Sequence, residues 1–479
     1  MKNTLLLGLF FLALIISSCA QPEKGIPITT SSSEARDLFI QGRDRLENIE
    51  FSAAAKLFDQ AIAKDSTFAL AYMYRASSGG GSQVVRINQE KAHALAAKVS
   101  EGERVLIDYM QAASDANRPK EKELLDRLLT MFPEDKRVRL NLGLYFQTIN
   151  DSKSALECYT KATELDSTYA PAYNLIGYMN MAQGKLDAAE KPFKKYISLL
   201  PGKPNPYDSY AELLLKMGRY DESIVQYQKA YDTDNLFIGS LSGIANNYIF
   251  KGDYAKAREY EQMYFDKATQ VNDKLGAMYN KALSFMYENK LDDVIKAFEE
   301  RRTFAEREKQ SAAVIYSIAY QGFALWEMGK ASDGLKKTEE AIAMIEKVEL
   351  RPRQKENLQA YSNMWRAIGY AFNNQLDKAK ASADLYRKDV EARNNPDEKI
   401  GLEQVVALID YKGGKYDAAI ERLAKLEPDP WGMFYQGQAL LKKGDKAGAK
   451  ALFTKIANWN QNSIQLAAVW SRTHKELGK

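Results

Sequence analysis

The chain has 479 residues, of which 45% are apolar, 27% charged and 11% aromatic. This composition is typical of folded proteins and excludes a largely disordered or fibrous chain, while the length requires either several domains or one array of repeats. Lysine and arginine number 67 against 63 aspartate and glutamate residues, so the overall charge does not indicate a nucleic-acid-binding protein.

The N-terminal segment, residues 1–18, is expected to be a secretory signal peptide. Lys2 is followed by an apolar or glycine run, residues 5–16, which is too short for the roughly 20 apolar residues of a membrane-spanning helix. Residues 16–19 read Ile-Ser-Ser-Cys and resemble the lipobox of bacterial lipoproteins. The resemblance implies that Cys19 is acylated, becomes the N-terminus and anchors the protein in a membrane. The alternative is an ordinary secretion signal followed by an unrelated cysteine.

Residues 19–34 are predicted to form the lipidated cysteine and a flexible tether, because they are rich in proline, serine and threonine and show no helical periodicity. At ~3.3 Å per residue, such a tether reaches at most about 50 Å from the membrane. Ala20 follows the cysteine at the position where, in the best-known bacterial sorting rule, aspartate retains lipoproteins at the inner membrane. The resemblance therefore implies a location in the bacterial cell envelope, in the outer membrane facing the periplasm.

Beyond the tether, the sequence repeats with a period close to 34 residues. Small residues that open the same pattern recur at intervals of 33 or 34 residues, with one tyrosine in their place: Gly42, Ala76, Tyr109, Gly143, Gly177, Ala211 and Ala245. The pattern continues at less regular intervals of 30 to 47 residues through Ala282, Gly322, Gly369, Ala407 and Gly437. Self-similarity at such a period is the signature of a repeat array, and these positions give about twelve units.

Each unit of the repeat is predicted to be a helical hairpin. Twelve residues after the first small residue comes a second one, and four further on a large apolar residue, as in Ala155 and Tyr159. Between the two helices lie turns such as residues 184–187, Gly-Lys-Leu-Asp, in which glycine ends the first helix and aspartate caps the second. The small residues allow the two helices to cross closely, and we expect the large aromatic residue to pack against the next hairpin.

This pattern resembles the tetratricopeptide repeat family. In the unit from residue 136 to 169 the matching positions are Leu142, Gly143, Phe146, Ala155, Tyr159 and Ala162, with Ser167 where the family usually has proline. The resemblance implies an all-α fold, a right-handed superhelical solenoid of about twelve antiparallel helical hairpins. We expect a regular array over residues 35–270, a divergent array with longer helices and loops over residues 271–462, and a capping helix over residues 463–479.

In this family the inner face of each first helix lines a concave groove that binds extended peptides or partner helices. The positions of this sequence that correspond to the family's inner face are the candidate partner-binding residues Arg137, Leu144, Asn174, Tyr178, Asp208, Glu212, Asn246, Phe250 and Tyr279. Their mixture suits polar and aromatic recognition rather than a purely apolar groove. The resemblance thus implies a non-enzymatic scaffold whose partner is a protein or peptide, and nucleic acid is not expected.

No set of catalytic or metal-binding residues emerges from the sequence. His93 and His474 are the only histidines and fall in different repeats, which excludes a multi-histidine metal site, and no nucleotide-binding or metalloprotease motif is present. We therefore expect neither an enzyme nor a bound cofactor or metal. A second hypothesis stays open, a glycan- or solute-binding lipoprotein that partners an outer-membrane transporter, since such proteins also carry tetratricopeptide helices after a lipobox.

Overall fold

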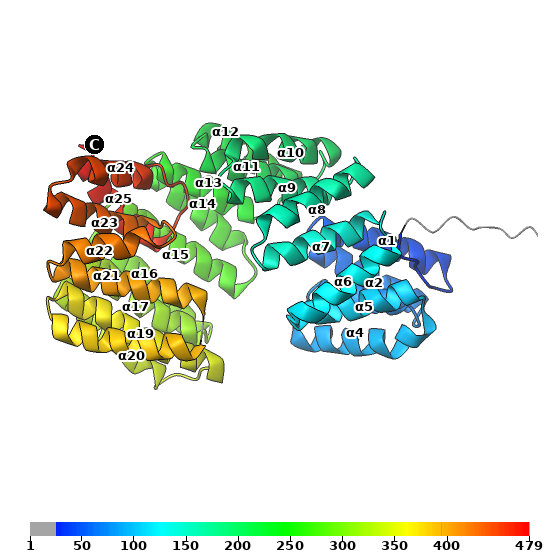
Figure 1. The fold of residues 1–479 in the computed structure, drawn as a ribbon, viewed down its shortest axis with the longest axis horizontal. Helices are drawn as coiled ribbons and strands as arrows, with labels where there is room; N and C mark the ends of the chain where they lie inside the picture. The colour runs from blue at the N-terminus through cyan, green and yellow to red at the C-terminus, as the bar shows by residue number, and fades with distance from the viewer. Residues whose placement is uncertain (1–24, 394, 479) are drawn as a thin grey trace, which may run out of the picture. The chain divides into compact units, whose positions relative to one another are not determined.

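The structure of the protein, a computed structural model, describes residues 25–393 and 395–478 (Figure 1). These residues form 25 α-helices and one short 3-10 helix, and they contain no β-strand. The predicted signal peptide, residues 1–18, and Cys19 lie outside the described residues. The helices group into two compact units, unit 1 up to Leu199 and unit 2 from Leu200 onward. Among the described helices, none is both long enough and apolar enough to cross a lipid bilayer.

Unit 1 contains five hairpins, in each of which two consecutive helices pack along each other. The pairs are α1 (Ser33–Glu47) with α2 (Phe51–Lys64), α3 (Ala69–Ser77) with α4 (Gly81–Leu95), α5 (Glu101–Ser114) with α6 (Arg118–Met131), α7 (Lys136–Thr148) with α8 (Ser152–Leu165), and α9 (Ala170–Ala182) with α10 (Leu186–Leu199). The 3-10 helix η1 (Ala96–Lys98) follows α4. The first helices of these hairpins are therefore the odd-numbered ones.

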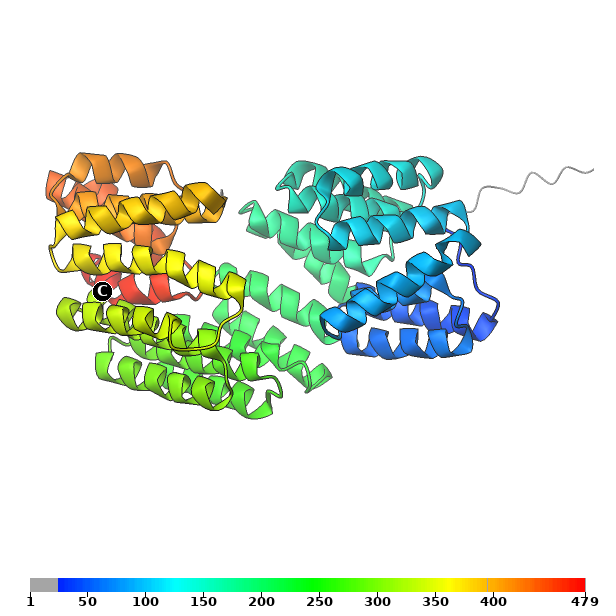
Figure 2. The ribbon, with the colours of Figure 1, turned by 90° about the horizontal axis from the view of Figure 1, so that it is seen from below.

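Unit 2 contains seven hairpins and one further helix, α25 (Ile464–Glu476). In Figure 2 its helices are coloured from green to red. The pairs are α11 (Pro204–Lys216) with α12 (Tyr220–Thr233), α13 (Gly239–Phe250) with α14 (Tyr254–Lys267), α15 (Val271–Tyr287) with α16 (Leu291–Arg307), α17 (Ser311–Glu327) with α18 (Ala331–Ile345), α19 (Pro352–Phe372) with α20 (Leu376–Arg393), α21 (Pro396–Lys412) with α22 (Tyr416–Ala424), and α23 (Pro430–Lys443) with α24 (Lys446–Ala457). The twelve hairpins of the described chain confirm the predicted all-α repeat fold.

The wider repeat intervals after residue 270 correspond to longer helices. Helices α11 and α12 have 13 and 14 residues, whereas α15, α16 and α17 have 17 each and α19 has 21. Each added turn lengthens the packed face of a hairpin by about 5.4 Å. The extra residues therefore enlarge the packed core of unit 2.

The small residues of the repeat let each hairpin close tightly. A Cβ atom built on Gly143 would lie 2.4 Å from the Cε1 atom of Tyr159, which shows that the ring fills the place of a side chain. The same contact recurs in the pairs Gly42–Phe58, Gly177–Phe193 and Gly437–Phe453. These rings therefore fill the space over the glycine of their own hairpin, which the sequence analysis did not predict. Phe58 also meets the next hairpin as expected, since its ring centroid lies 5.8 Å from that of Tyr74. Tyr227 follows the expectation, since it packs on Gly243 of the next hairpin.

The turns inside the hairpins use the left-handed backbone conformation that the sequence predicts. Gly184 has a φ angle of 71° and Asn289 one of 60°, which these residue types adopt at low cost. The aspartates that follow act in two ways. Asp253 caps α14 by accepting a hydrogen bond from the backbone N–H of Lys256 (3.1 Å). Asp187 lies within the first turn of α10 instead, where its charge stabilises the positive end of the helix dipole.

The segment before α1 differs from the flexible tether predicted for residues 19–34. Residues 25–31, here named the N-terminal strap, lie on unit 1 and donate hydrogen bonds to three carboxylates. The backbone bonds run from Ile26 to Asp135 (3.0 Å), from Thr29 to Glu103 (2.6 Å) and from Ser31 to Asp65 (2.8 Å). The serine and threonine content that indicated flexibility also supplies hydroxyl donors, because Thr30 donates a further bond to Asp65 (2.6 Å).

Candidate partner-binding groove

The five first helices of unit 1 share an inner face that carries a groove of about 570 Å³, here named the unit 1 groove. Helices α1, α3, α5, α7 and α9 all contribute to its walls. Its lining includes Leu46, Glu47, Ile49, Phe51, Tyr74, Met110, Arg137, Leu144, Tyr169 and Asn174. Stacked hairpins bring their first helices to one side, so residues far apart in the sequence converge on this surface.

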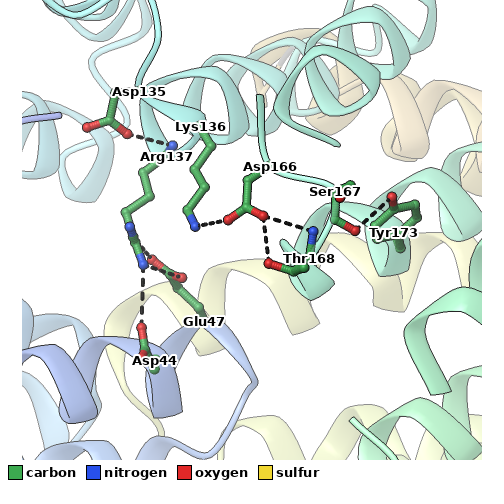
Figure 3. Close-up of polar contacts among 9 residues, drawn as sticks. All are labelled: Asp44, Glu47, Asp135, Lys136, Arg137, Asp166, Ser167, Thr168 and Tyr173. Atoms are coloured by element: carbon green, nitrogen blue, oxygen red, sulfur yellow. Dashed lines mark hydrogen bonds and ion pairs between the residues drawn. The ribbon is translucent and has the colours of Figure 1, made fainter. Parts of the chain in front are cut away.

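Arg137 of α7 lines the unit 1 groove and reaches two carboxylates of α1 (Figure 3). Its Nε donates a hydrogen bond to the carboxylate of Glu47 (2.6 Å), and its Nη2 lies 3.4 Å from Oδ1 of Asp44. The guanidinium carbon also lies 5.7 Å from the ring centroid of Tyr169. Burial alone would lower the pKa of Arg137, but the Glu47 carboxylate raises it above its ordinary value. The pair therefore joins the first and fourth hairpins of unit 1 by a fixed charge.

A second polar cluster beside Arg137 is satisfied within the protein (Figure 3). The carboxylate of Asp166 accepts bonds from the ammonium of Lys136 and from the backbone N–H and hydroxyl of Thr168 (2.8 and 2.6 Å). These donors, Lys136 first, lower the pKa of Asp166 to about 2. The hydroxyl of Tyr173 donates to the carbonyl oxygen of Ser167 (3.2 Å). These contacts fix the loop between α8 and α9, and the carboxylate of Asp166 is hydrogen-bonded within the protein.

Two buried polar atoms on the wall of the unit 1 groove have no hydrogen-bond partner in the described part of the protein. They are the hydroxyl oxygen of Tyr169 and Oδ1 of Asn174, on side chains that are 5% and 6% exposed. Burial raises the pKa of Tyr169 well above its ordinary value, so its hydroxyl keeps its proton and remains a donor. Such an unpaired group costs about 1–3 kcal/mol. The wall of the groove therefore holds one unpaired donor and one unpaired acceptor, which a ligand reaches only when the side chains that cover them move.

The rim of the unit 1 groove is apolar and open to solvent. Ile49 and Phe51 lie there with 46% and 49% of their surface exposed. Leu46 and Met110 line the same groove and are half-buried. Large exposed apolar side chains gathered at a groove mark an interaction surface more often than isolated ones do. Together with Tyr169, they form a surface suited to a chain that has both apolar side chains and polar backbone groups.

The inner face of unit 2 is occupied by the protein's own helix α25. This helix packs against the first helices α15, α17 and α23, and lies beside α24 (Figure 1). The ring of Trp470 lies 5.9 Å from that of Phe250 and 5.5 Å from that of Tyr287, centroid to centroid. The buried apolar residues of α25 are Ile464, Leu466, Ala467, Ala468, Val469 and Trp470. They cover several sides of the helix, so α25 belongs to the core of unit 2 and is more than the predicted cap.

A buried carboxylate fixes α25 in this position. Glu327 of α17 accepts hydrogen bonds from the indole N–H of Trp431 (2.6 Å) and from the hydroxyl of Tyr435 (2.9 Å) on α23. Arg472 of α25 completes the set with an ion pair to the same carboxylate. The Glu327 side chain is fully buried, and a buried carboxylate is stable only when it is paired and hydrogen-bonded in this way. The arrangement specifies where α25 lies.

With this geometry established, comparison with known proteins identifies the repeat. A family model described as a tetratricopeptide repeat matches residues 140–204. Residues 140–204 therefore carry tetratricopeptide repeats. The crystal structure of MamA is similar at 22% identity with a TM-score of 0.31, covering 35% of this chain and 95% of that one.

Two curated proteins also match part of this chain. Anaphase-promoting complex subunit 3 of Schizosaccharomyces pombe is 24% identical over 164 residues, which are 34% of this chain and 24% of that protein. Protein O-mannosyl-transferase TMTC3 of Homo sapiens is 26% identical over 167 residues, which are 32% of this chain and 18% of that protein. This chain thus spans about a quarter or less of the length of either relative.

The structure separates the nine predicted partner-binding residues into three groups. Arg137, Leu144 and Asn174 lie together in the unit 1 groove. Tyr178 lies in the same unit but packs edge-on against Phe193 of its own hairpin, with ring centroids 5.3 Å apart. Its aromatic ring therefore serves the hairpin contact more than the groove.

The remaining predicted residues lie in unit 2, on the face that carries α25 and the loop before it. Asp208, Glu212 and Asn246 line a cavity of about 620 Å³ whose wall includes residues 460–462. Asn246 accepts a hydrogen bond from Nδ2 of Asn462 (2.8 Å). Phe250 is buried under Trp470, and the backbone N–H of Ile464 reaches the hydroxyl of Tyr279. The side chains of Asn246, Phe250 and Tyr279 therefore contact α25 or the loop before it. The expectation that they face a partner is corrected accordingly.

Two carboxyl groups of unit 2 lie in surroundings that favour their protonated form. Burial raises the pKa of Asp208 to about 6, although a hydrogen bond from the Ser240 hydroxyl (2.7 Å) opposes the shift. Burial raises the pKa of Glu261 to about 8, against hydrogen bonds from Ser242 (2.8 Å) and Asn280 (3.2 Å).

Within residues 25–393 and 395–478, no group of three histidine, cysteine or acidic side chains is placed to hold a metal ion.

The sequence analysis missed several residues of the unit 1 groove. Glu47, Tyr74, Tyr169, Ile49 and Phe51 line it but were not predicted. Glu47 and Tyr74 lie on the first helices of the first two hairpins. Applying the inner-face pattern to these two hairpins as well would have predicted them. Ile49, Phe51 and Tyr169 lie just outside the first helices, at positions that helical periodicity does not assign to a face.

Proposed function

We propose that this protein is a non-enzymatic, membrane-anchored scaffold of the bacterial cell envelope that binds a segment of a partner protein in the unit 1 groove. The observation that carries the proposal is the unpaired, buried hydroxyl of Tyr169 and carbonyl oxygen of Asn174 beside the exposed side chain of Phe51. A peptide supplies all that these groups lack, since its backbone both donates and accepts hydrogen bonds and its apolar side chains cover the rim.

The proposed anchor is an acyl group on Cys19 in the outer membrane, facing the periplasm. The support is the Ile-Ser-Ser-Cys sequence at residues 16–19 behind an apolar run. Fractionation without detergent tests this step. Cys19→Ser should move the protein from the membrane fraction to the soluble fraction, and unchanged membrane retention would count against acylation.

A quantitative pull-down from envelope extract of the host tests the groove, with cross-linking and the full mature chain as bait. The informative pair of variants is Phe51→Glu and Leu385→Glu, because these side chains are 49% and 50% exposed but only Phe51 lies in the unit 1 groove. One protein recovered near equal stoichiometry, lost with Phe51→Glu and kept with Leu385→Glu, is the expected result. Equal recovery with both variants would remove the groove from the proposal.

A second candidate function, glycan or solute binding, has one specific observation in its favour. Unit 2 contains a cavity of about 220 Å³ lined by the aromatic residues Tyr316, Tyr320, Phe323, Trp326, Trp365 and Trp431, with Gln404 and Gln465 beside them. Aromatic faces stack on sugar rings, and amides bond to hydroxyls. Binding on a glycan array that is lost with Trp365→Ala and kept with Phe51→Glu would favour this function. Binding that Trp365→Ala leaves unchanged would exclude this cavity.

A further inference from the structure

The N-terminal strap, residues 25–31, closes a second cavity on unit 1. The cavity measures about 350 Å³, and its walls include the strap residues Gly25 and Ile26 and the side chains of Arg36, Arg43 and Arg137. Arg36 and Arg43 are seven residues apart on α1, which places both on the same face of that helix. Three guanidinium groups therefore border one small space next to the first described residue of the chain.

The charges of this cavity are not balanced. Arg137 is paired with Glu47 and Asp44. The only acidic residue among the lining, Asp135, already accepts bonds from the backbone N–H groups of Ile26 and Arg137 (3.0 and 2.7 Å).

Arg36 and Arg43, by contrast, have no carboxylate partner in the described part of the chain. The Nε atom of Arg43 is buried without a hydrogen-bond acceptor among the described residues. Its guanidinium lies 5.7 Å from the ring centroid of Phe39, which holds the side chain in place without neutralising it. The cavity is thus short of an anion.

We propose that this cavity binds the phosphate group of an anionic phospholipid headgroup. The planar donors of arginine match the oxygen atoms of phosphate in pairs, which suits two arginines on one helix face. The proposal rests on the proposed anchor at Cys19 for the nearness of a membrane. Gly25 lies six positions after Cys19, and at ~3.3 Å per position the chain between them spans about 20 Å at most. Gly25 itself lines the cavity, so the anchored end brings this cavity to the lipid surface.

The docked strap keeps the distance between the proposed anchor at Cys19 and the cavity short. A flexible segment over residues 19–34 would leave unit 1 free to lie far from the membrane. The bonds to Asp65, Glu103 and Asp135 fix residues 26–31 instead. The arginines therefore lie within reach of the membrane that holds the proposed acyl group, where an anionic headgroup would attract them.

Vesicle flotation with the full mature chain carrying Cys19→Ser, which is not acylated, tests the site. The vesicles are pure phosphatidylcholine or phosphatidylcholine mixed with phosphatidylglycerol. We expect binding only with phosphatidylglycerol, weakened about fivefold by either Arg36→Gln or Arg43→Gln. The control is the pair Arg353→Gln and Lys442→Gln, two exposed cations of unit 2, which should leave binding unchanged. Thermal melts followed by circular dichroism confirm that each variant is folded.

Three outcomes would overturn the proposal. Equal binding to both vesicle types would remove the need for an anionic headgroup. Equal weakening by the control pair would assign the effect to overall charge. Glycerol 3-phosphate that binds in solution, is lost with Arg43→Gln, and has no counterpart on vesicles would make the cavity a site for a soluble phosphate. Because the test chain lacks the acyl group, failure of the anchor in the fractionation experiment leaves these results unaffected, and failure here leaves the anchor and the unit 1 groove untouched.

Discussion

Units 1 and 2 are built from the same kind of hairpin, but their inner faces differ. In unit 1 the first helices enclose a groove whose rim exposes Phe51 and whose wall holds the unpaired hydroxyl of Tyr169. In unit 2 the corresponding face is covered by α25, and Phe250 is buried under Trp470. A repeat array thus offers an inner face that either binds a partner or accepts a segment of its own chain. The segment of its own chain, α25, also completes the hydrophobic core of unit 2.

Two buried carboxyl groups, Asp65 of unit 1 and Glu261 of unit 2, respond to burial in opposite ways. In unit 1, burial acts to raise the pKa of Asp65, but hydrogen bonds from Thr30, Thr67 and the Ser31 amide hold it well below its ordinary value. In unit 2, burial prevails and raises the pKa of Glu261 to about 8. Ionised Asp65 therefore stabilises unit 1, whereas unit 2 loses stability when Glu261 ionises.

The largest effect is expected from a substitution that disrupts the covered inner face of unit 2. Trp470→Ala should lower the free energy of unfolding of unit 2 by about 3–5 kcal/mol, because the ring packs between Phe250 and Tyr287. Hydrogen exchange of the α15 and α25 amides measures the loss. The matched change on the open groove, Phe51→Ala, should cost about 0.5 kcal/mol or less in unit 1. Equal losses would mean that the two inner faces do not differ as described.

A smaller effect is expected from releasing the strap. Asp65→Ala removes the acceptor for Thr30, Ser31 and Thr67, and should lower the free energy of unfolding of unit 1 by about 2 kcal/mol. Because the pKa of Asp65 is lowered on folding, its contribution is present above the ordinary value of 3.8 and is lost as the pH falls below it. Faster hydrogen exchange in residues 26–31 is the readout. Unchanged protection there would contradict the docked strap.

The pH dependence of unit 2 should have the opposite sign. Between pH 4.5 and about 8 the folded protein keeps the proton of Glu261 that the unfolded chain has lost. The free energy of unfolding should therefore fall by up to about 1.4 kcal/mol per pH unit in that window. Glu261→Gln should abolish this part of the slope in chemical denaturation. Glu259→Gln, which alters an exposed residue of the same helix, should keep it. A parallel slope in wild type and Glu261→Gln would refute the assignment.

The smallest effect concerns the open groove itself. Tyr169→Phe removes the buried hydroxyl that has no partner in the described structure and keeps the ring on which Lys136 and Arg137 lie, 4.7 and 5.7 Å from its centroid. Unit 1 should become more stable by about 1 kcal/mol, while partner recovery in the pull-down should decrease. A variant that is less stable, or that binds equally well, would show that the hydroxyl serves the fold.

The fold was predictable because its signals are local. The spacing of Gly143 and Tyr159 predicted a hairpin, and the two residues meet in one. The turn at Gly184 and the joint position of Arg137 and Asn174 were predicted in the same way. In each case the relevant neighbours lie within one or a few repeat lengths, so periodicity places them correctly.

The features that the sequence did not predict depend on distant contacts. Trp470 meets Phe250 across 220 positions of sequence, and Ile26 meets Asp135 across 109. Helical periodicity identifies α25 as a helix but not the surface that receives it. One signal was present, since residues 464–470 contain apolar side chains on more than one face, which is typical of a helix buried all round.

The position of α25 also sets an order of events during folding. The hairpins of unit 1 are held mainly by neighbours in sequence, and such local contacts form rapidly as each hairpin becomes available. The core of unit 2 includes Ile464, Leu466 and Trp470 alongside Ile249 and Phe298, so it cannot close before residues 464–470 have been synthesised. A ribosome that has completed α24 thus carries a finished unit 1 and an unfinished unit 2. The newly made protein becomes fully folded only after α25 emerges, and until then the surface that α25 covers is exposed to chaperones and proteases.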